Sequence, residues 1–161
     1  MHPRAAELVR ILDLAPHPEG GFFREIFRSS LSVSPADGRQ ARSALTTIFF
    51  LLVEGQFSRW HGVASDEVWH LYEGGPLELL VASRDGGDVQ RLRLGPAAAD
   101  AGPTHTVPAY SWQAARPLGP YALAGCTVGP GFDYQDFHFL ADHPDALARL
   151  RATAPDLLSL L

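Results

Sequence analysis

The feature that most constrains the fold is a succession of short stretches with strand character, separated by glycine and proline. Each is rich in β-branched and aromatic residues and is too short for a typical helix. About nine such stretches at close spacing predict an all-β sandwich or barrel of antiparallel strands. Helical periodicity is confined to residues 4–14 and 142–155, where Asp142 is the expected N-cap and Pro144 falls in the first turn. The strand-like stretches are 21–29, 43–53, 57–63, 66–72, 76–84, 88–94, 105–115, 121–128 and 132–140.

Several of these stretches carry further expectations. Residues 43–53 are almost continuously apolar, as in a strand buried on both faces. Residues 76–84 and 88–94, joined through Asp-Gly-Gly, predict a hairpin. Residues 32–41 are expected to form an exposed loop. The N-terminal strand is expected to lack a partner, so that it and the apolar strand leave surface to be covered, and we therefore expect a homodimer.

Composition limits the classes of function. The 161 residues suit a single domain spanning 1–161, and a net charge of −5 with no basic stripe argues against nucleic acid as a partner. No apolar run is long enough to span a membrane, and the N-terminus does not have the pattern of a signal peptide, so the expected location is cytoplasmic. Lysine is absent, which excludes Schiff-base chemistry and leaves arginine as the only strongly basic side chain.

The stretch from Gly55 to Gly75, GQFSRWHGVASDEVWHLYEGG, concentrates titratable groups in strand-like sequence. An inward-facing carboxylate such as Glu67 costs several kcal/mol unless it is paired or solvated. His61 and Glu67 are therefore expected to face one solvent-connected pocket at the mouth of the barrel. Converging polar side chains of this kind usually mark a small-molecule site.

The spacing in this stretch continues in a second segment, and together they resemble the two motifs of the cupin superfamily. In the first motif Gly55, His61, Glu67 and Gly74 match, and Val63 replaces the second histidine. In the second motif Gly102 and Pro108 match, and Tyr110, Gln113 and Pro117 stand where glycine, histidine and asparagine are usual. The resemblance implies a double-stranded β-helix, the cupin jelly-roll barrel, with short N- and C-terminal helices. The phrases HPEGGFFRE, SRWHGVASDEVWHLYEG, VPAYSWQAA and GPGFDYQDF look like the RmlC-like subgroup of uncharacterised proteins related to dTDP-4-keto-6-deoxyhexose epimerases.

The same resemblance bears on metal binding. A metal-bearing cupin uses three histidines and one glutamate, of which this chain keeps His61 and Glu67. Valine has no lone pair to donate, and a glutamine carbonyl is a weak ligand beside imidazole. We therefore expect no metal and no other cofactor, and if a metal were present its ligands would be His61, Glu67 and Gln113. Strand alternation sends His70 to the outer face, away from this set.

The resembled epimerases suggest catalytic roles. There, a motif histidine oriented by a carboxylate removes a proton beside a ketone, a tyrosine returns one on the other face, and a cation steadies the enolate. His61, Glu67, Tyr134 and Arg59 could take these parts. Further ligand-binding candidates are Gln113, Tyr110, Glu19 and Trp69, although tryptophans more often belong to the core.

Three functions stay open at this stage. The first is a metal-independent, sugar epimerase- or isomerase-like enzyme acting on a small ligand such as a carbohydrate or an organic acid. The second is a non-catalytic binding or sensing protein that uses the same pocket. The third is a metal-dependent cupin enzyme. His70, His105 and His138 have no assigned role, and His2, His17 and His143, which lie beside prolines, are expected to be solvated.

Overall fold

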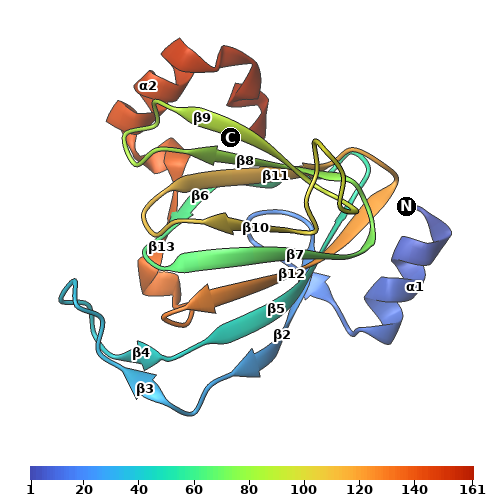
Figure 1. Cartoon of the computed structure of the whole chain (residues 1–161), viewed down its shortest axis with the longest axis horizontal. Coiled ribbons are helices and arrows are strands. Elements are labelled where there is room, and N and C mark those ends of the chain that lie inside the picture. Colours follow the sequence, from blue (N-terminus) through green and yellow to red (C-terminus); the bar gives the residue numbers. More distant parts are fainter.

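The computed structural model describes residues 1–161 and consists mainly of two antiparallel sheets that face each other (Figure 1). This arrangement confirms the predicted all-β jelly-roll barrel. The six-stranded sheet has the order β1 (Ala15–Pro16), β2 (Phe22–Arg28), β5 (Thr46–Val53), β12 (Tyr121–Gly129), β7 (Asp66–Gly74) and β10 (Thr104–Val107). The five-stranded sheet has the order β13 (Phe137–Phe139), β6 (Ser58–Val63), β11 (Trp112–Pro117), β8 (Leu77–Ala82) and β9 (Val89–Leu94). A small separate pair joins β3 (Ser32–Val33) and β4 (Arg42–Ser43).

Inward-facing side chains of both sheets form the main core. Strand alternation sends every second residue of β5, β7, β8 and β12 into this space. The cluster includes Phe50, Leu52, Trp69, Leu79 and Cys126, and Phe50 meets Trp69 edge to face. The core fills the space between the sheets toward one end and leaves the other end to polar side chains.

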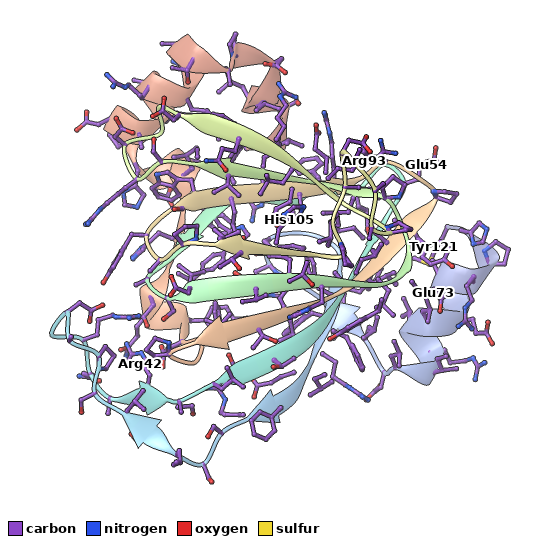
Figure 2. All side chains as sticks on the ribbon, viewed as in Figure 1. Arg42, Glu54, Glu73, Arg93, His105 and Tyr121 are labelled. Carbon is purple, nitrogen blue, oxygen red and sulfur yellow. The ribbon has the colours of Figure 1, made fainter.

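Helices cover the outer faces of the two sheets. The helix α1 (Pro3–Ile11) packs Ala5 and Leu8 on the six-stranded sheet, and Arg4 forms a two-pronged ion pair with Glu73. Figure 2 shows Glu73 and Tyr121 beside this helix. The helix α2 (Pro144–Thr153) and the 3₁₀ helix η3 (Pro155–Leu160) cover the five-stranded sheet. Two shorter 3₁₀ helices are η1 (Tyr134–Asp136) and η2 (Leu140–Asp142). None of the helices is long and apolar enough to cross a membrane.

The structure corrects four details of the sequence prediction. Asp142 ends η2 and is not the N-cap of α2, because Pro144 takes the first helical position and leaves His143 at the cap. Stretch 105–115 is two strands in different sheets, since Pro108 cannot donate to a ladder. The N-terminal strand β2 has a partner, β5, along its length. The strand β5 is continuously buried only from Phe50 onward, since residues 47–49 are partly exposed.

Tyr110 explains why the second motif normally carries a glycine at its position. Its backbone adopts a left-handed conformation, with φ of 65°, in the turn between β10 and β11. This region suits glycine and is a genuine outlier for a bulky residue. The side chain is held on both sides, because its hydroxyl donates to Asp37 and the Arg84 guanidinium lies 4.9 Å from its ring centre. These contacts support a conformation that tyrosine otherwise disfavours.

Candidate functional site

A cavity of about 330 Å³ opens between the two sheets at the end where β2 ends and β7 begins. We call it the mouth cavity. Its outer rim carries Glu25, Arg28 and Tyr134, and the side chain of Tyr134 is largely exposed. The residues that line it are His17, Glu19, Phe23, Glu25, Arg28, Thr46, Ile48, His61, Val63, Glu67, Cys126, Val128, Phe132, Asp133, Tyr134 and Phe137.

A tight turn before β2 carries Glu19 into the depth of this cavity. Gly20 and Gly21 both have positive φ, and a side chain at Gly20 would collide with the carbonyl of Phe57. The backbone N–H of Arg59 donates to the Glu19 carbonyl at 2.8 Å and fixes the turn against β6. The Glu19 side chain is consequently buried and reaches His61.

His61 is held in one tautomer and one orientation. Its Nδ1 lies 2.7 Å from the Arg59 carbonyl, which can only accept, so Nδ1 carries the proton. The other nitrogen, Nε2, then faces the cavity and lies 3.0 Å from a Glu19 carboxyl oxygen. The ring stacks on Phe137, with centroids 5.2 Å apart. The direct carboxyl partner of His61 is thus Glu19, and Glu67 is the more distant acid.

Gln113 links His61 to Glu67 from the floor of the site. The Trp69 indole N–H donates to Gln113 Oε1 at 3.0 Å, and an indole can only donate. The amide nitrogen must therefore point the other way, where it donates to Glu67 Oε2 at 2.6 Å and lies 3.1 Å from His61 Nε2. Gln113 presents hydrogens to the cavity and keeps its oxygen in the core.

Burial favours the uncharged forms of these groups. It raises the pKa of Glu19 to about 8, and it raises the pKa of Glu67 above its ordinary value. It lowers the pKa of His61, against the opposing charge of Glu67, and it lowers the pKa of His17 to about 4. Near neutral pH the His61–Glu19 pair is therefore a neutral imidazole facing a protonated carboxyl. The lone pair of His61 Nε2 lies within hydrogen-bonding distance of two donors, the Gln113 amide at 3.1 Å and the Glu19 carboxyl at 3.0 Å.

The donors do not fit the metal centre usual for this fold. Val63 supplies no lone pair, and Gln113 turns its N–H groups toward the place where an imidazole nitrogen would bind a metal. Turning the amide over would break its bond with Trp69. No group of three or more histidine, cysteine, aspartate or glutamate side chains in the structure has the arrangement of a metal site. His61 and Glu67 remain as two good ligands without the others.

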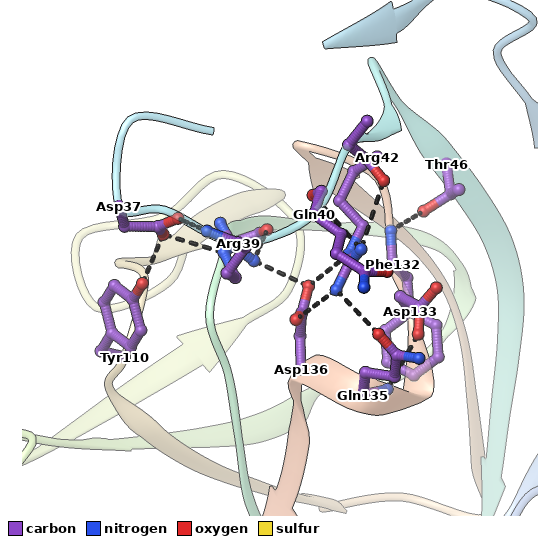
Figure 3. A network of polar contacts seen from close by, with 12 residues as sticks. Asp37, Arg39, Gln40, Arg42, Thr46, Tyr110, Phe132, Asp133, Gln135 and Asp136 are labelled. Carbon is purple, nitrogen blue, oxygen red and sulfur yellow. Dashed lines mark hydrogen bonds and ion pairs between the residues drawn. The ribbon is translucent and has the colours of Figure 1, made fainter. Parts of the chain in front are cut away.

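A polar network braces the wall of the mouth cavity from behind (Figure 3). Arg42 donates two hydrogen bonds of 2.9 Å to the buried Asp136, and Arg39 donates a third at 2.8 Å. Arg39 also binds Asp37, whose carboxylate accepts from Tyr110. The segment expected to be an exposed loop is thereby tied to η1, and η1 carries Tyr134 to the rim.

The structure gathers some predicted residues at the mouth cavity and places others elsewhere. His61, Glu67, Glu19 and Tyr134 line it, with Gln113 bonded behind them. Arg59 does not line it, because its long side chain lies over the Phe139 ring at 4.1 Å and donates to the Pro18 carbonyl.

The remaining candidates lie away from it. Trp69 is fully buried in the core and touches the site only through Gln113. Tyr110 lines a separate, more open cavity together with His138 and His143. His70 lies beside Thr104 and stacks on Tyr72, and His105 contacts the Arg93 carbonyl. The predicted outward direction of His70 agrees with this placement.

Several residues that line the mouth cavity were not predicted from the sequence. His17 was expected to be solvated, but its side chain is 7% exposed and packs edge-on against Phe23. Glu25 and Arg28 alternate with outward residues on β2, and a bulge in that strand carries Arg28 to the rim. The one usable signal was the Glu-Gly-Gly sequence, since paired glycines beside an acid indicate a close backbone approach.

This chain is similar to one protein family and to several proteins of known structure. A family model described as Cupin superfamily (DUF985) matches residues 6–140. A hypothetical protein from Leishmania major is 32% identical, with a TM-score of 0.78, over 93% of this chain and 98% of that one. A protein of known crystal structure from Shewanella oneidensis is 28% identical, with a TM-score of 0.81, over 97% of this chain and 93% of that one. KdgF from Halomonas sp. shares the fold, at 15% identity and a TM-score of 0.53, over 76% and 90% of the two chains. No curated protein matches the sequence.

Proposed function

The chain belongs to the cupin superfamily, in the family described as DUF985, and from this membership and the geometry of the mouth cavity we propose that it acts on a small polar organic ligand by proton transfer. The reaction class is that of an isomerase or epimerase, and the substrate is a carbohydrate or an organic acid with a carbonyl group. No step requires a metal. This proposal specifies a chemistry that the fold alone does not determine.

One observation carries the proposal. His61 Nε2 faces the cavity with its lone pair, because Nδ1–H is committed to the Arg59 carbonyl at 2.7 Å. Histidine held in this way, with a pKa lowered by burial, is in the free-base form at neutral pH. A general base must be unprotonated at working pH and offer its lone pair to substrate. His61 Nε2 lies at the cavity for this purpose, and a bound substrate would take the place of the Gln113 N–H that lies 3.1 Å from it.

The steps follow from the residues present. His61 removes a proton from the carbon beside the carbonyl, so that the C–H bond breaks, an N–H bond forms and the electron pair moves to the carbonyl oxygen. The protonated Glu19 carboxyl, 3.0 Å from His61, can donate to that oxygen, a part first considered for Arg59. The Tyr134 hydroxyl at the rim can return a proton to the carbon from another side, so that its O–H bond breaks, a C–H bond forms and the carbonyl is restored. Solvent then protonates Tyr134 and takes the proton from His61. The Arg59 carbonyl and the stacked Phe137 ring hold the imidazole in place, and Glu67 accepts from Gln113 beside it.

Deuterium exchange tests the proposal without knowledge of the product. The protein is incubated in deuterated water with keto sugars and keto acids, and loss of the C–H signal beside the carbonyl is followed by proton NMR. We expect exchange with at least one compound, and a loss of at least about 10²-fold in His61→Gln. The control is His70→Gln, on the outer face of β7, which should exchange at the native rate. Exchange that persists in His61→Gln, or native protein that exchanges none of the panel, would contradict the proposal.

A second candidate function is binding without turnover. It is favoured by the short contact of Gln113 Nε2 with His61 Nε2 at 3.1 Å, because an N–H directed at the lone pair competes with any substrate proton. In that case His61→Gln would weaken the ligand by about 1–3 kcal/mol, the cost of stranding a polar partner. Calorimetry that shows binding together with NMR that shows no exchange would favour this function.

We also propose that the chain forms a homodimer. Ile26, Phe27 and Tyr72 are exposed apolar side chains on the six-stranded sheet, and the edge of β2 beyond Phe23 has no strand beside it. Open edges and apolar patches of this kind are commonly covered by a second copy. Sedimentation at micromolar concentration should show a dimer, and a monomer there would reject the proposal.

A further inference from the structure

The charges around the mouth cavity define which ligands can enter it. Four carboxyl groups line the cavity, from Glu19, Glu25, Glu67 and Asp133, and Arg28 is the only arginine among the lining residues. With no lysine in the chain, every other strong cation would have to be an arginine. Carboxyl groups therefore outnumber arginines by four to one among the residues that line the cavity.

Arg28 is already neutralised. Its Nε and Nη2 donate to the two oxygens of Glu25 at 2.9 and 2.7 Å, and its Nη1 donates to the Phe132 carbonyl at 3.1 Å. A guanidinium paired in this two-pronged way satisfies its geometry on one carboxylate. Arg59, the nearest alternative, points at Phe139 and the Pro18 carbonyl, outside the cavity.

The imidazoles do not supply a cation either. His17 Nδ1 accepts from the Glu19 backbone N–H at 3.2 Å, which requires an unprotonated nitrogen there. His61 uses Nδ1–H on the Arg59 carbonyl, and its Nε2 lies 3.1 Å from a Gln113 N–H, which requires an unprotonated nitrogen there too. An anionic group in the cavity would therefore meet buried carboxyls and neutral rings, with no free positive charge.

The remaining surface suits an uncharged sugar. Phe132, Tyr134 and Phe137 form an aromatic wall, and Val63, Ile48 and Val128 add apolar area. A sugar ring can pack its C–H face on such a wall and direct its hydroxyls at Glu19, Glu67 and His61, since hydroxyls both donate and accept. The volume of about 330 Å³ lies at the small end of ligand pockets, which run from roughly 300 to 1,000 Å³.

We propose that the natural ligand of the mouth cavity is an uncharged monosaccharide, and that the cavity discriminates against carboxylate- and phosphate-bearing sugars. This inference rests on the proposed function for the location of the site, and it narrows the substrate class to exclude organic acids and nucleotide sugars. The discrimination is by charge, because matched neutral and anionic sugars differ little in shape.

Matched sugar pairs test the inference. Methyl glucoside, methyl galactoside and methyl mannoside are titrated beside the corresponding methyl hexuronides, with binding followed by calorimetry at low and high salt. We expect at least one neutral member to bind, and its hexuronide to bind at least about tenfold more weakly at low salt, since burying an anion without a counter-ion is strongly disfavoured. Equal or tighter binding of the hexuronides, or no binding of either class at millimolar concentration, overturns the inference.

A charge variant sharpens the test. In Glu25→Gln the Arg28 guanidinium loses its partner and becomes available at the rim, so the affinity for the hexuronide should rise at least about threefold, and the gain should shrink at high salt. The control is Glu54→Gln, which removes the same charge from an exposed residue after the far end of β5. Figure 2 shows Glu54 at the opposite side of the molecule from Arg42. An equal gain in both variants would show a general effect of net charge and would contradict the local explanation.

The result separates this inference from the proposed function. Preference for neutral sugars together with absent deuterium exchange would keep the ligand class and reject the catalytic proposal. Exchange that depends on His61 but occurs only on anionic substrates would keep the catalytic proposal and reject the ligand class.

Discussion

Two buried carboxyl clusters meet at the segment 132–137, and they are built in opposite ways. Asp136 and Glu67 are nearly equally buried, at 5% and 7% exposure. Asp136 is surrounded by the guanidinium groups of Arg39 and Arg42, which hold its pKa below the ordinary value. The close partners of Glu67 are uncharged, the Gln113 amide and the Cys126 thiol, and burial raises its pKa.

The difference shows that one fold can use buried carboxyl groups for two purposes, to stabilise the structure and to transfer protons. A carboxylate matched by arginines is fixed in charge and position, and it ties the β3–β4 segment to η1. Carboxyls matched by neutral groups can change protonation near neutral pH, which is what proton transfer requires. We call Asp136 with Arg39 and Arg42 the braced cluster, and Glu19 and Glu67 with His61 and Gln113 the reactive cluster. The two clusters meet at η1, where the braced cluster sets the position of Tyr134 at the rim of the reactive cluster.

The largest effect is expected from removing the braced acid. Asp136→Asn leaves Arg42 buried without a counter-ion and should lower the free energy of unfolding by about 3–5 kcal/mol, the usual cost of breaking a buried pair. Urea denaturation followed by circular dichroism measures this loss. The control Asp142→Asn changes an exposed aspartate and should cost less than about 0.5 kcal/mol. Equal losses in the two variants would remove the distinction between the clusters.

The reactive cluster should reveal itself in the pH dependence of stability. The pKa of Glu19 rises on folding from 4.5 to about 8, so the folded chain holds a proton that the unfolded chain lacks, and stability falls as pH rises through that range. The pKa of His17 falls on folding from 6.5 to about 4 and has the opposite effect below pH 6.5. Of these two groups, only Glu19 changes the free energy of unfolding between pH 6.5 and 8.

Glu19→Gln should therefore flatten the stability curve between pH 6.5 and 8. The native protein should lose up to about 2 kcal/mol across this range through Glu19, at 1.36 kcal/mol per pH unit for one proton. Denaturation at several pH values provides the measurement, and Glu54→Gln, an exposed acid, serves as the matched control. A Glu19→Gln variant with the native slope would show that Glu19 is ionised in the folded protein.

Metal content distinguishes the reactive cluster from the metal centres of other cupins. Protein purified without added metal should contain far less than one equivalent of iron, manganese or zinc by elemental analysis. The double variant Val63→His and Gln113→His restores the usual ligand types and should bind zinc at least about tenfold more tightly than the native chain, about 1.4 kcal/mol. Stoichiometric metal in native protein that survives a chelator would overturn this expectation.

The smallest effect is expected at the cation beside the reactive cluster. Arg59→Gln removes a guanidinium that packs on Phe139 outside the cavity, so it should cost about 0.5–1 kcal/mol of stability and change any exchange rate by less than about threefold. Thermal unfolding and the deuterium assay report the two quantities. A loss of exchange comparable to that of His61→Gln would return Arg59 to the role of enolate clamp.

The sequence predicted the fold well because the pattern of short strands and the two motifs are local and regular. It also predicted correctly that His61, Glu67 and Val63 face the interior of the barrel, because alternation along one strand fixes their direction. It could not place Arg59, since a long side chain that begins on the inner face can leave it at a sheet edge. Nor could it find His17 or Arg28, because their positions depend on a tight turn and a bulge that bring distant segments together.

The bond from Trp69 to Gln113 makes the protein its own spectroscopic probe. The indole N–H is buried, and a single amide connects it to both His61 and Glu67. Ionisation of Glu67 or arrival of a ligand alters the polarisation of that amide, and the altered amide changes the shielding of the indole proton. The Trp69 indole resonance in a nitrogen–proton correlation spectrum should therefore report the protonation of the site and its occupancy in the unmodified chain. Trp60 provides an internal reference, because its indole N–H donates to the Leu157 carbonyl on the outer face of the five-stranded sheet.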